Sequence, residues 1–156
     1  MAIEISPQKY SGSVRPMAFG SGERAFTVGG DTAFPFFTFE GKMPNAPKIG
    51  IQVLDFTPDD WAEACVEPYK DVLNDPVAWA KKAQDEYGAD FIQLWLKSTD
   101  PNGLNRSAAD AAETAKAVAD AIDVPLLVWG CANAQKDAEV LSKVAEVYNG
   151  QDIIIG

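Results

Sequence analysis

The sequence predicts an α/β fold built from repeated strand–helix units, with a parallel sheet. Four short apolar, β-branched runs each end on polar or glycine residues, and stretches with helical spacing separate the last three runs. The runs are residues 49–56, 90–98, 125–131 and 152–156. Near-continuous apolar strands that alternate with helices are typical of a parallel sheet buried on both faces. Four such units make the N-terminal half of a TIM-barrel-type fold, which has eight units.

The composition excludes several classes of function. The chain has 156 residues, 47% of them hydrophobic, and its 13 basic and 23 acidic residues give a net charge of −10. An acidic chain is poorly suited to bind nucleic acid or anionic membrane surfaces, because both are negatively charged. No apolar run approaches the roughly 18 residues of a spanning helix, and the N-terminus lacks a signal-peptide core. We expect a cytoplasmic protein, because the chain has only two cysteines, Cys65 and Cys131, and they lie far apart in the sequence.

The absence of histidine limits the chemistry of the chain. It removes Ser-His-Asp and Cys-His nucleophile pairs, histidine-ligated zinc and the most common proton shuttle near neutral pH. It also removes a histidine lower ligand for a cobalamin, and two cysteines cannot supply four thiolates to an iron–sulfur cluster. We therefore expect no catalytic residue and no metal ligand here, and any cofactor on another chain.

Residues 1–47 differ in composition and patterning from the rest, and we expect an N-terminal arm and a β-hairpin there. The hairpin is expected within residues 25–39, with the turn at Gly29-Gly30-Asp31, because glycine accepts the positive φ of tight turns. Four aromatic residues nearby are too apolar to lie in water. We expect them to plug one end of the barrel, the alternative being that they pack on a partner: Phe34, Phe36, Phe37 and Phe39.

Residues 48–156 are expected to form the half-barrel, and their helices follow in order. A long excursion at residues 57–75 contains a predicted short helix at 59–65, and its place after a strand is typical of functional loops. Longer helices are predicted at residues 76–87, 107–122 and about 134–148. The last helix is expected to bury Ala138, Leu141, Val144, Ala145 and Tyr148. The four tryptophans are expected in the core or in an interface: Trp61, Trp79, Trp95 and Trp129.

A barrel is favoured over an open sheet. The strands begin at residues 49, 90, 125 and 152, and these spacings suit βα units with right-handed crossovers. The G-x-G-x-x-G turn of a Rossmann fold is missing, and polar residues follow every strand. A complete barrel takes about 250 residues. We therefore expect either that the native protein continues beyond Gly156 or that the chain is a shortened form, and pairing of two half-barrels is the remaining alternative.

Three polar clusters follow the predicted strands, and eight of their residues are candidate cofactor-binding residues. They are Asp55, Lys97, Ser98, Thr99, Asp100, Asn102, Cys131 and Asn133. Each cluster also has a structural interpretation. Residues 100–103 (DPNG) are a good turn sequence, Lys97 and Asp55 could simply pair, Cys131 could be packing and Asn133 could cap a helix. No nucleophile stands beside a base, so the residues alone indicate a parallel half-barrel with a polar mouth.

Seven strings in a fixed order resemble a known family, and the resemblance runs from about residue 8 to the last residue. They are residues 29–37 (GGDTAFPFF), 39–41 with Pro44-Asn45, Asp75-Pro76 with 79–82, 87–91, 98–103 (STDPNG), 123–126 (DVPL) and Gly130-Cys131 with 136–141 (KDAEVL). The family is the small subunit of the corrinoid iron–sulfur protein, also called the delta subunit of the acetyl-CoA decarbonylase/synthase complex.

This resemblance implies a TIM barrel paired with a large, gamma-type subunit that carries both a corrinoid (cobalamin) and a [4Fe–4S] cluster. The cobalt would accept a methyl group from a methyltetrahydropterin and deliver it to acetyl-CoA synthase in the reductive acetyl-CoA (Wood–Ljungdahl) pathway. A methyltetrahydrofolate methyltransferase and acetyl-CoA synthase would be transient partners. The small subunit would cap the corrinoid and bind no cofactor alone. Family members continue through strands five to eight, which this chain lacks.

The main rival is an enzyme on the same barrel, a pterin-binding methyltransferase. In that interpretation Asp55, Asp100 and Asn133 would hydrogen-bond the pterin ring, as polar groups at a pocket mouth do. The lack of histidine does not exclude it, because such sites rely mostly on Asp and Asn.

Overall fold

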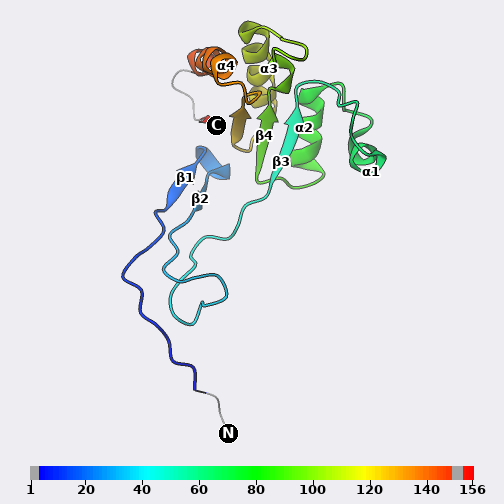
Figure 1. The fold of residues 1–156 in the computed structure, drawn as a ribbon. Helices are drawn as coiled ribbons and strands as arrows, with labels where there is room; N and C mark the ends of the chain where they lie inside the picture. The colour runs from blue at the N-terminus through cyan, green and yellow to red at the C-terminus, as the bar shows by residue number, and fades with distance from the viewer. Residues whose placement is uncertain (1–3, 149–152) are drawn as a thin grey trace.

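The computed structural model describes residues 4–148 and 153–156, which form two sheets (Figure 1). An antiparallel hairpin consists of β1 (Met17–Phe19) and β2 (Phe26–Val28). A four-stranded parallel sheet follows, made of β3 (Gly50–Leu54), β4 (Phe91–Trp95), β5 (Leu126–Trp129) and β6 (Ile154–Ile155). Its strands lie in chain order. The predicted parallel α/β fold with an N-terminal hairpin is confirmed, although Asp152 of the last predicted strand lies outside the described residues.

Three helices connect the parallel strands: α2 (Pro76–Asp85), α3 (Ala108–Ala121) and α4 (Ala134–Val147). The predicted helices agree with them to within two residues at each end. Their first turns are capped by the side chains of Asp75, Ser107 and Asn133, which accept hydrogen bonds from backbone N–H groups further on. Such caps satisfy donors that the helix itself leaves free. Sequence patterns that depend on local chemistry therefore located the helices well.

The helices pack on one face of the parallel sheet, and this corrects the expectation that both faces are buried. Ile92, Leu94 and Val128 on the helix side have no exposed surface. On the other side, Trp129 is 47% exposed and pairs in register with Trp95. The physical reason is the strand order, because right-handed crossovers between strands added in one direction place every helix on the same side.

The buried stripe of α4 also differs from the predicted one. Val140, Val144 and Tyr148 are buried, whereas Ala138 and Ala145 are exposed. The Tyr148 hydroxyl donates to the carbonyl oxygen of Ala115 in α3 at 2.6 Å, which sets the rotation of α4 against α3. A periodic pattern of alanines gives little hydrophobic preference between neighbouring faces of a helix.

The hairpin turn lies at residues 20–25, and the expected turn at Gly29-Gly30-Asp31 is wrong. A Cβ on Gly20 would lie 2.5 Å from Pro125 Cγ, so the turn touches the sheet where only glycine fits. Gly29 and Gly30 also have positive φ, but the chain there continues along the N-terminal arm. The Gly30 amide donates to the Val14 carbonyl oxygen at 3.0 Å, and the Val14 amide donates to that of Asp31 at 2.8 Å.

Phe19 and Phe26 of the hairpin cover the N-terminal end of the parallel sheet. The ring of Phe26 lies 6.0 Å from that of Phe91 at the start of β4, and 5.6 Å from that of Phe19. The plug expected from residues 34–39 is therefore wrong, because those phenylalanines are exposed in a loop that hangs away from the sheet (Figure 1). Their alternative role, packing on a partner, stays a prediction.

The excursion after β3 packs on the outer side of α2 (Figure 1). Its short helix is α1 (Glu63–Val66), four residues later in its start than predicted. The ring of Trp79 in α2 lies 5.7 Å from that of Trp61, edge to face, and 5.5 Å from that of Tyr69. These aromatic contacts fix the excursion against the body of the protein.

Candidate functional site

The buried carboxylate of Asp55 joins the C-terminal ends of β3 and β4. Asp55 is 2% exposed, and its Oδ1 accepts a hydrogen bond from the Ser98 amide at 2.9 Å. Its Oδ2 accepts another from Ser98 Oγ. Ser98 belongs to the short 3₁₀ turn Lys97–Thr99, so this contact between distant segments fixes the loop after β4 to the end of β3.

Burial raises the pKa of the Asp55 carboxyl above its usual range, because desolvation penalises the charged form. The two hydrogen bonds from Ser98 and the nearby charge of Arg106 oppose that rise. Arg106 also donates from Nη1 to the Asp55 carbonyl oxygen at 3.5 Å, and from its backbone amide to that of Ser98 at 3.0 Å. Asp55 is therefore placed to hold the loop in position.

The remaining predicted residues of this loop bond mostly within it. The hydroxyl of Thr99 is fully buried and donates to the Leu96 carbonyl oxygen at 2.7 Å. Asp100 Oδ1 accepts from the backbone amide of Asn102 at 2.8 Å and from its Nδ2 at 3.3 Å. These contacts are those of the turn that the sequence favours, and Asn102 is exposed.

Lys97 lies on the less covered face of the sheet. Its Nζ is 5.3 Å from the centre of the Trp95 ring, which is a cation–π distance. The alternative in which Lys97 pairs with Asp55 is wrong, because no ion pair joins these two side chains among the described residues and Asp55 accepts from Ser98 instead. Among the described residues Lys97 forms no ion pair, so its charge is available at this edge of the sheet.

Asp137 of α4 holds the third cluster, which lies at the end of β5, in place. Its Oδ1 accepts from the Cys131 amide at 2.7 Å, and a Cβ on Gly130 would clash with the same oxygen. Cys131 is buried, and Asn133 Oδ1 accepts from the Lys136 amide at 3.1 Å as the cap of α4. Packing and capping therefore account for the contacts of both residues.

The structure gathers these clusters at one edge of the sheet, which we call the strand-end edge: the C-terminal ends of β3, β4 and β5 with the loops that follow them. The Leu96 amide donates to the Trp129 carbonyl oxygen at 2.8 Å, which ties the second cluster to the third. Sequence reasoning placed Asp137 beside the third cluster but missed Arg106 as part of this edge. A lone arginine directly before the capping Ser107 was the only signal for it.

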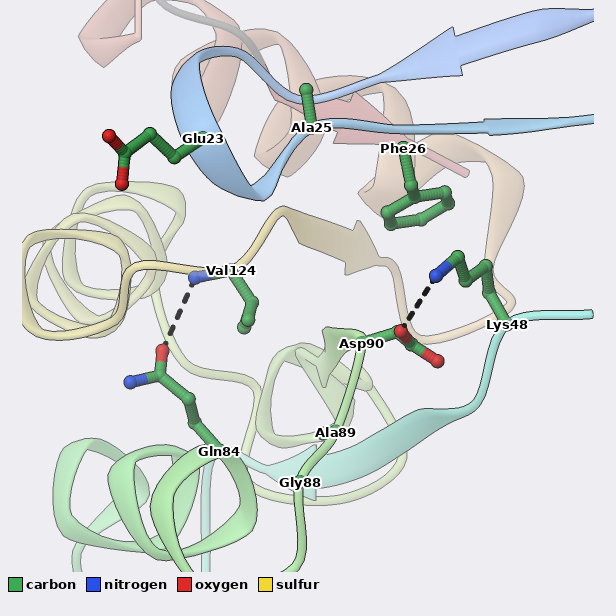
Figure 2. A pocket seen from close by; sticks show the side chains of 9 residues that line it. All are labelled: Glu23, Ala25, Phe26, Lys48, Gln84, Gly88, Ala89, Asp90 and Val124. Atoms are coloured by element: carbon green, nitrogen blue, oxygen red, sulfur yellow. Dashed lines mark hydrogen bonds and ion pairs between the residues drawn. The ribbon is translucent and has the colours of Figure 1, made fainter. Parts of the chain in front are cut away.

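A hollow of about 460 Å³ lies at the opposite end of the strands, between the hairpin and the sheet (Figure 2). Gln84 Oε1 there accepts from the amides of Asp123 and Val124 at 2.7 and 3.2 Å. Lys48 Nζ lies 3.0 Å from Asp90 Oδ1, and the other Asp90 oxygen accepts from the Ile49 amide. Because these polar groups form hydrogen bonds and an ion pair with one another, we interpret the hollow as a structural contact region between the hairpin and the sheet. Parallel βα folds bind ligands at the other, C-terminal end.

The residues present do not fit a resident iron–sulfur cluster. Among the described residues, no group of three or more Cys, Asp or Glu side chains is arranged to hold a metal ion. Cys65 is exposed and Cys131 is buried, whereas a [4Fe–4S] cluster takes four thiolates. In the part of the chain that the structure describes, no helix has the length and apolarity to cross a membrane.

The fold and the strand-end edge define a class, a parallel βα-unit protein whose polar strand-end residues hold loops together. Comparison with protein families is more specific. The family model described as CO dehydrogenase/acetyl-CoA synthase delta subunit matches residues 16–156. The chain belongs to this family, and the resemblance seen in the sequence is confirmed.

Curated relatives are also described as delta subunits. The acetyl-CoA decarbonylase/synthase complex subunit delta of Archaeoglobus fulgidus is 37% identical over 98% of this chain and 35% of its own length. Subunit delta 1 of Methanosarcina thermophila is 40% identical over 87% of this chain and 31% of its own. Subunit delta of Methanothermobacter thermautotrophicus is 34% identical over 99% of this chain and 40% of its own. The chain thus spans about a third of the length of the relatives it matches.

Proposed function

We propose that this chain is part of the small subunit of a corrinoid iron–sulfur methyl carrier in the cytoplasm. Its partner is a large, gamma-type subunit that holds the corrinoid and the [4Fe–4S] cluster. The small subunit caps the corrinoid while a methyl group passes from a methyltetrahydropterin, through its methyltransferase, to acetyl-CoA synthase in the reductive acetyl-CoA pathway. Membership of the delta-subunit family supports this proposal.

The sheet is proposed to be the first half of a TIM barrel. The sequential strand order and the helices on a single face support this, because a doubly wound sheet carries helices on both faces. The less covered face then becomes the barrel interior. It presents two rows of paired side chains, Gln52 beside Gln93 and Trp95 beside Trp129, and barrel interiors are filled by such layers.

One observation carries the capping role: the polar residues of the strand-end edge are bonded to the scaffold. Asp55 holds the loop after β4, Asp137 holds the loop after β5, and Asn133 caps α4. A wall over a reduced cobalt centre has to be rigid and to exclude water, and it needs no catalytic residue. We assign the partner contact to Lys97, Asp100 and Asn102, which we call the rim residues.

The combined substitution Lys97→Ala, Asp100→Ala and Asn102→Ala tests this assignment. We expect the affinity for the purified large subunit to fall at least about tenfold, or about 1.4 kcal/mol. Methyl transfer from the loaded corrinoid should slow in parallel, because the cap is lost. Isothermal titration calorimetry and a methyl-transfer assay measure the two effects. A matched control on α4 is Ser142→Ala, Lys143→Ala and Glu146→Ala, and equal behaviour of the two triple variants would contradict the rim assignment.

The bonding pattern gives less support to the rival, a pterin-binding methyltransferase. Of the three residues that would hold the pterin, Asp55 is buried with both oxygens engaged, and Asn133 Oδ1 caps a helix. Micromolar binding of methyltetrahydrofolate to the isolated chain, lost in Asp100→Ala, would favour the rival. We expect no such binding in a titration followed by calorimetry.

A further inference from the structure

Asn102, one of the rim residues, is followed by Gly103 at the tip of the loop after β4. Residues 101–104, here called the loop tip, are all exposed. In an asparagine–glycine pair the backbone nitrogen of the glycine lies close to the side-chain carbonyl carbon of the asparagine, and no Cβ hinders its attack. Among the asparagines that the structure describes, Asn102 alone precedes a glycine; the others are Asn45, Asn74, Asn105 and Asn133.

The hydrogen bonds that hold Asn102 and Gly103 all go to Asp100, inside the same turn. The Gly103 amide donates to the Asp100 carbonyl oxygen at 2.9 Å. Asp100 Oδ1 accepts from the Asn102 amide at 2.8 Å and from Asn102 Nδ2 at 3.3 Å. An exposed tip that is held only by local bonds opens without disturbing the core, and opening frees the Gly103 nitrogen.

The fold does not itself require glycine at position 103. Gly103 is not in the left-handed region, unlike Gly20, Gly29 and Gly30. A Cβ at this position would meet nothing closer than the Asp100 carbonyl oxygen, at the ordinary contact distance of 3.6 Å. Alanine therefore fits here, so the chemical effect of the glycine can be separated from any structural effect.

The other asparagines provide internal comparisons. Asn45 Nδ2 donates to the Gly29 carbonyl oxygen at 2.7 Å, and Asn133 Oδ1 caps α4, so the fold holds both side chains in place. Asn74 is exposed like Asn102 but precedes Asp75, whose side chain hinders an attack by its backbone nitrogen. Asn74 is therefore the closest match to Asn102, because the two are equally accessible and the next residue differs.

We propose that Asn102 is a site of spontaneous deamidation in the free chain. The Gly103 N–H proton passes to a solvent base, and the Gly103 nitrogen bonds to the side-chain carbonyl carbon of Asn102, which closes a succinimide ring. The bond from that carbon to Nδ2 breaks, and the nitrogen takes up a proton from water and leaves as ammonia. A water molecule then opens the ring at either carbonyl, which gives aspartate or isoaspartate. The reaction consumes water, releases ammonia and needs no oxidant or reductant.

Deamidation would change the rim in two ways. The hydrogen bond from Asn102 Nδ2 to Asp100 Oδ1 would become a contact between two carboxylates, which repel each other. Isoaspartate would also add Cβ to the main chain and so lengthen the turn. This consequence rests on the proposed function, in which the rim residues contact the large subunit. The deamidated chain should then bind that subunit more weakly, and the bound subunit should protect Asn102 by keeping the loop tip closed.

Incubation of the full folded chain at mildly alkaline pH tests the proposal. Tryptic digestion releases residues 98–106, and fragment masses locate the conversion within that peptide. We expect Asn102 to convert several times faster than Asn74. Gly103→Ala should remove most of this conversion and leave the melting temperature the same or higher. Leu104→Ala, an exposed change in the same turn, is the matched control and should convert at the wild-type rate.

Two outcomes would overturn the proposal. Conversion of Asn102 only in urea would mean that the native loop tip does not open. Equal conversion in the wild type and in Gly103→Ala would mean that attack by the Gly103 nitrogen does not limit the reaction. Saturation with the purified large subunit gives a separate readout, because conversion should fall in proportion to the bound fraction. Conversion in the free chain without such protection would keep the modification site and contradict the rim assignment.

Discussion

Replacing Trp79 with alanine is expected to lower the free energy of unfolding by about 3–5 kcal/mol. Trp79 is 1% exposed and fills the space between α2, the excursion after β3 and the core. Its ring contacts Trp61 edge to face, and it also contacts Tyr69, which in turn lies 5.1 Å from Tyr87. Alanine would leave a cavity that these large rings cannot close. Domains of this size are stable by about 5–15 kcal/mol, so the loss is a large share of the total.

Trp129→Ala is the matched control for Trp79→Ala, because it removes the same side chain from a site that is 47% exposed. We expect the control to cost about 2 kcal/mol, less than Trp79→Ala, because roughly half of the Trp129 side chain is already exposed and less apolar surface returns to water. Urea denaturation followed by circular dichroism gives both values. Limited proteolysis adds local information, because Trp79→Ala should make residues 57–75 easier to cleave. Equal losses for the two variants would mean that the excursion does not pack on α2 as described.

The elements that the sequence predicted well depend on local chemistry. Ser107 and Asn133 cap α3 and α4, and each accepts the bond expected of a cap. The parallel strands were recognisable because their apolar runs are short, β-branched and bounded by turn residues. In both cases the deciding interactions lie within a few residues of each other in the chain.

The failures concern contacts between distant segments. The glycines at 29 and 30 have the positive φ that a turn needs, but the arm, through Val14, decides that the chain does not reverse there. The turn needs glycine at position 20, because Pro125, more than a hundred residues away, leaves no room for a Cβ. Local composition does not contain this information. The same holds for the phenylalanines within residues 34–39, whose exposure depends on which other segment covers the end of the sheet.

In the candidate site, too, contacts within a few residues were predictable and contacts between distant segments were not. Asp100 and Asn102 form the turn that their sequence favours, and Asn133 caps the helix that follows it. The partner of Asp55 was not predictable, because a lysine and a serine follow the second strand side by side. The 3₁₀ turn that follows the strand decides between them: Lys97 lies over Trp95 on the less covered face, and Ser98 turns toward the buried carboxylate.

Replacing Asp55 with alanine is expected to cost about 3 kcal/mol of unfolding free energy. The carboxylate accepts from both the amide and the hydroxyl of Ser98, and the two residues are 2% and 1% exposed. Alanine would leave two buried donors without an acceptor, and each unsatisfied donor costs about 1–3 kcal/mol. The loss of a desolvated charge offsets part of this cost. Guanidinium denaturation at pH 7 measures it, and Ser107→Ala, a cap worth about 1 kcal/mol, is a smaller reference.

Asp55→Asn separates the hydrogen bonds of this carboxyl from its charge. Asparagine keeps an oxygen for the Ser98 amide, and its Nδ2 can donate to Ser98 Oγ, so the loop stays attached. Burial raises the pKa of Asp55 in the folded protein above its usual value of 3.8. Between the unfolded and the folded pKa the folded state binds one more proton, so the wild type loses stability as the pH rises through that window. The asparagine variant lacks this loss, and its stability relative to the wild type should therefore increase from pH 4 upward until the folded carboxyl has ionised. Paired denaturation curves across this pH range cancel the titration of the other acidic residues. If the stability difference between the two proteins stayed constant or changed in the opposite direction, the contacts of the Asp55 carboxylate would stabilise it more than its burial destabilises it.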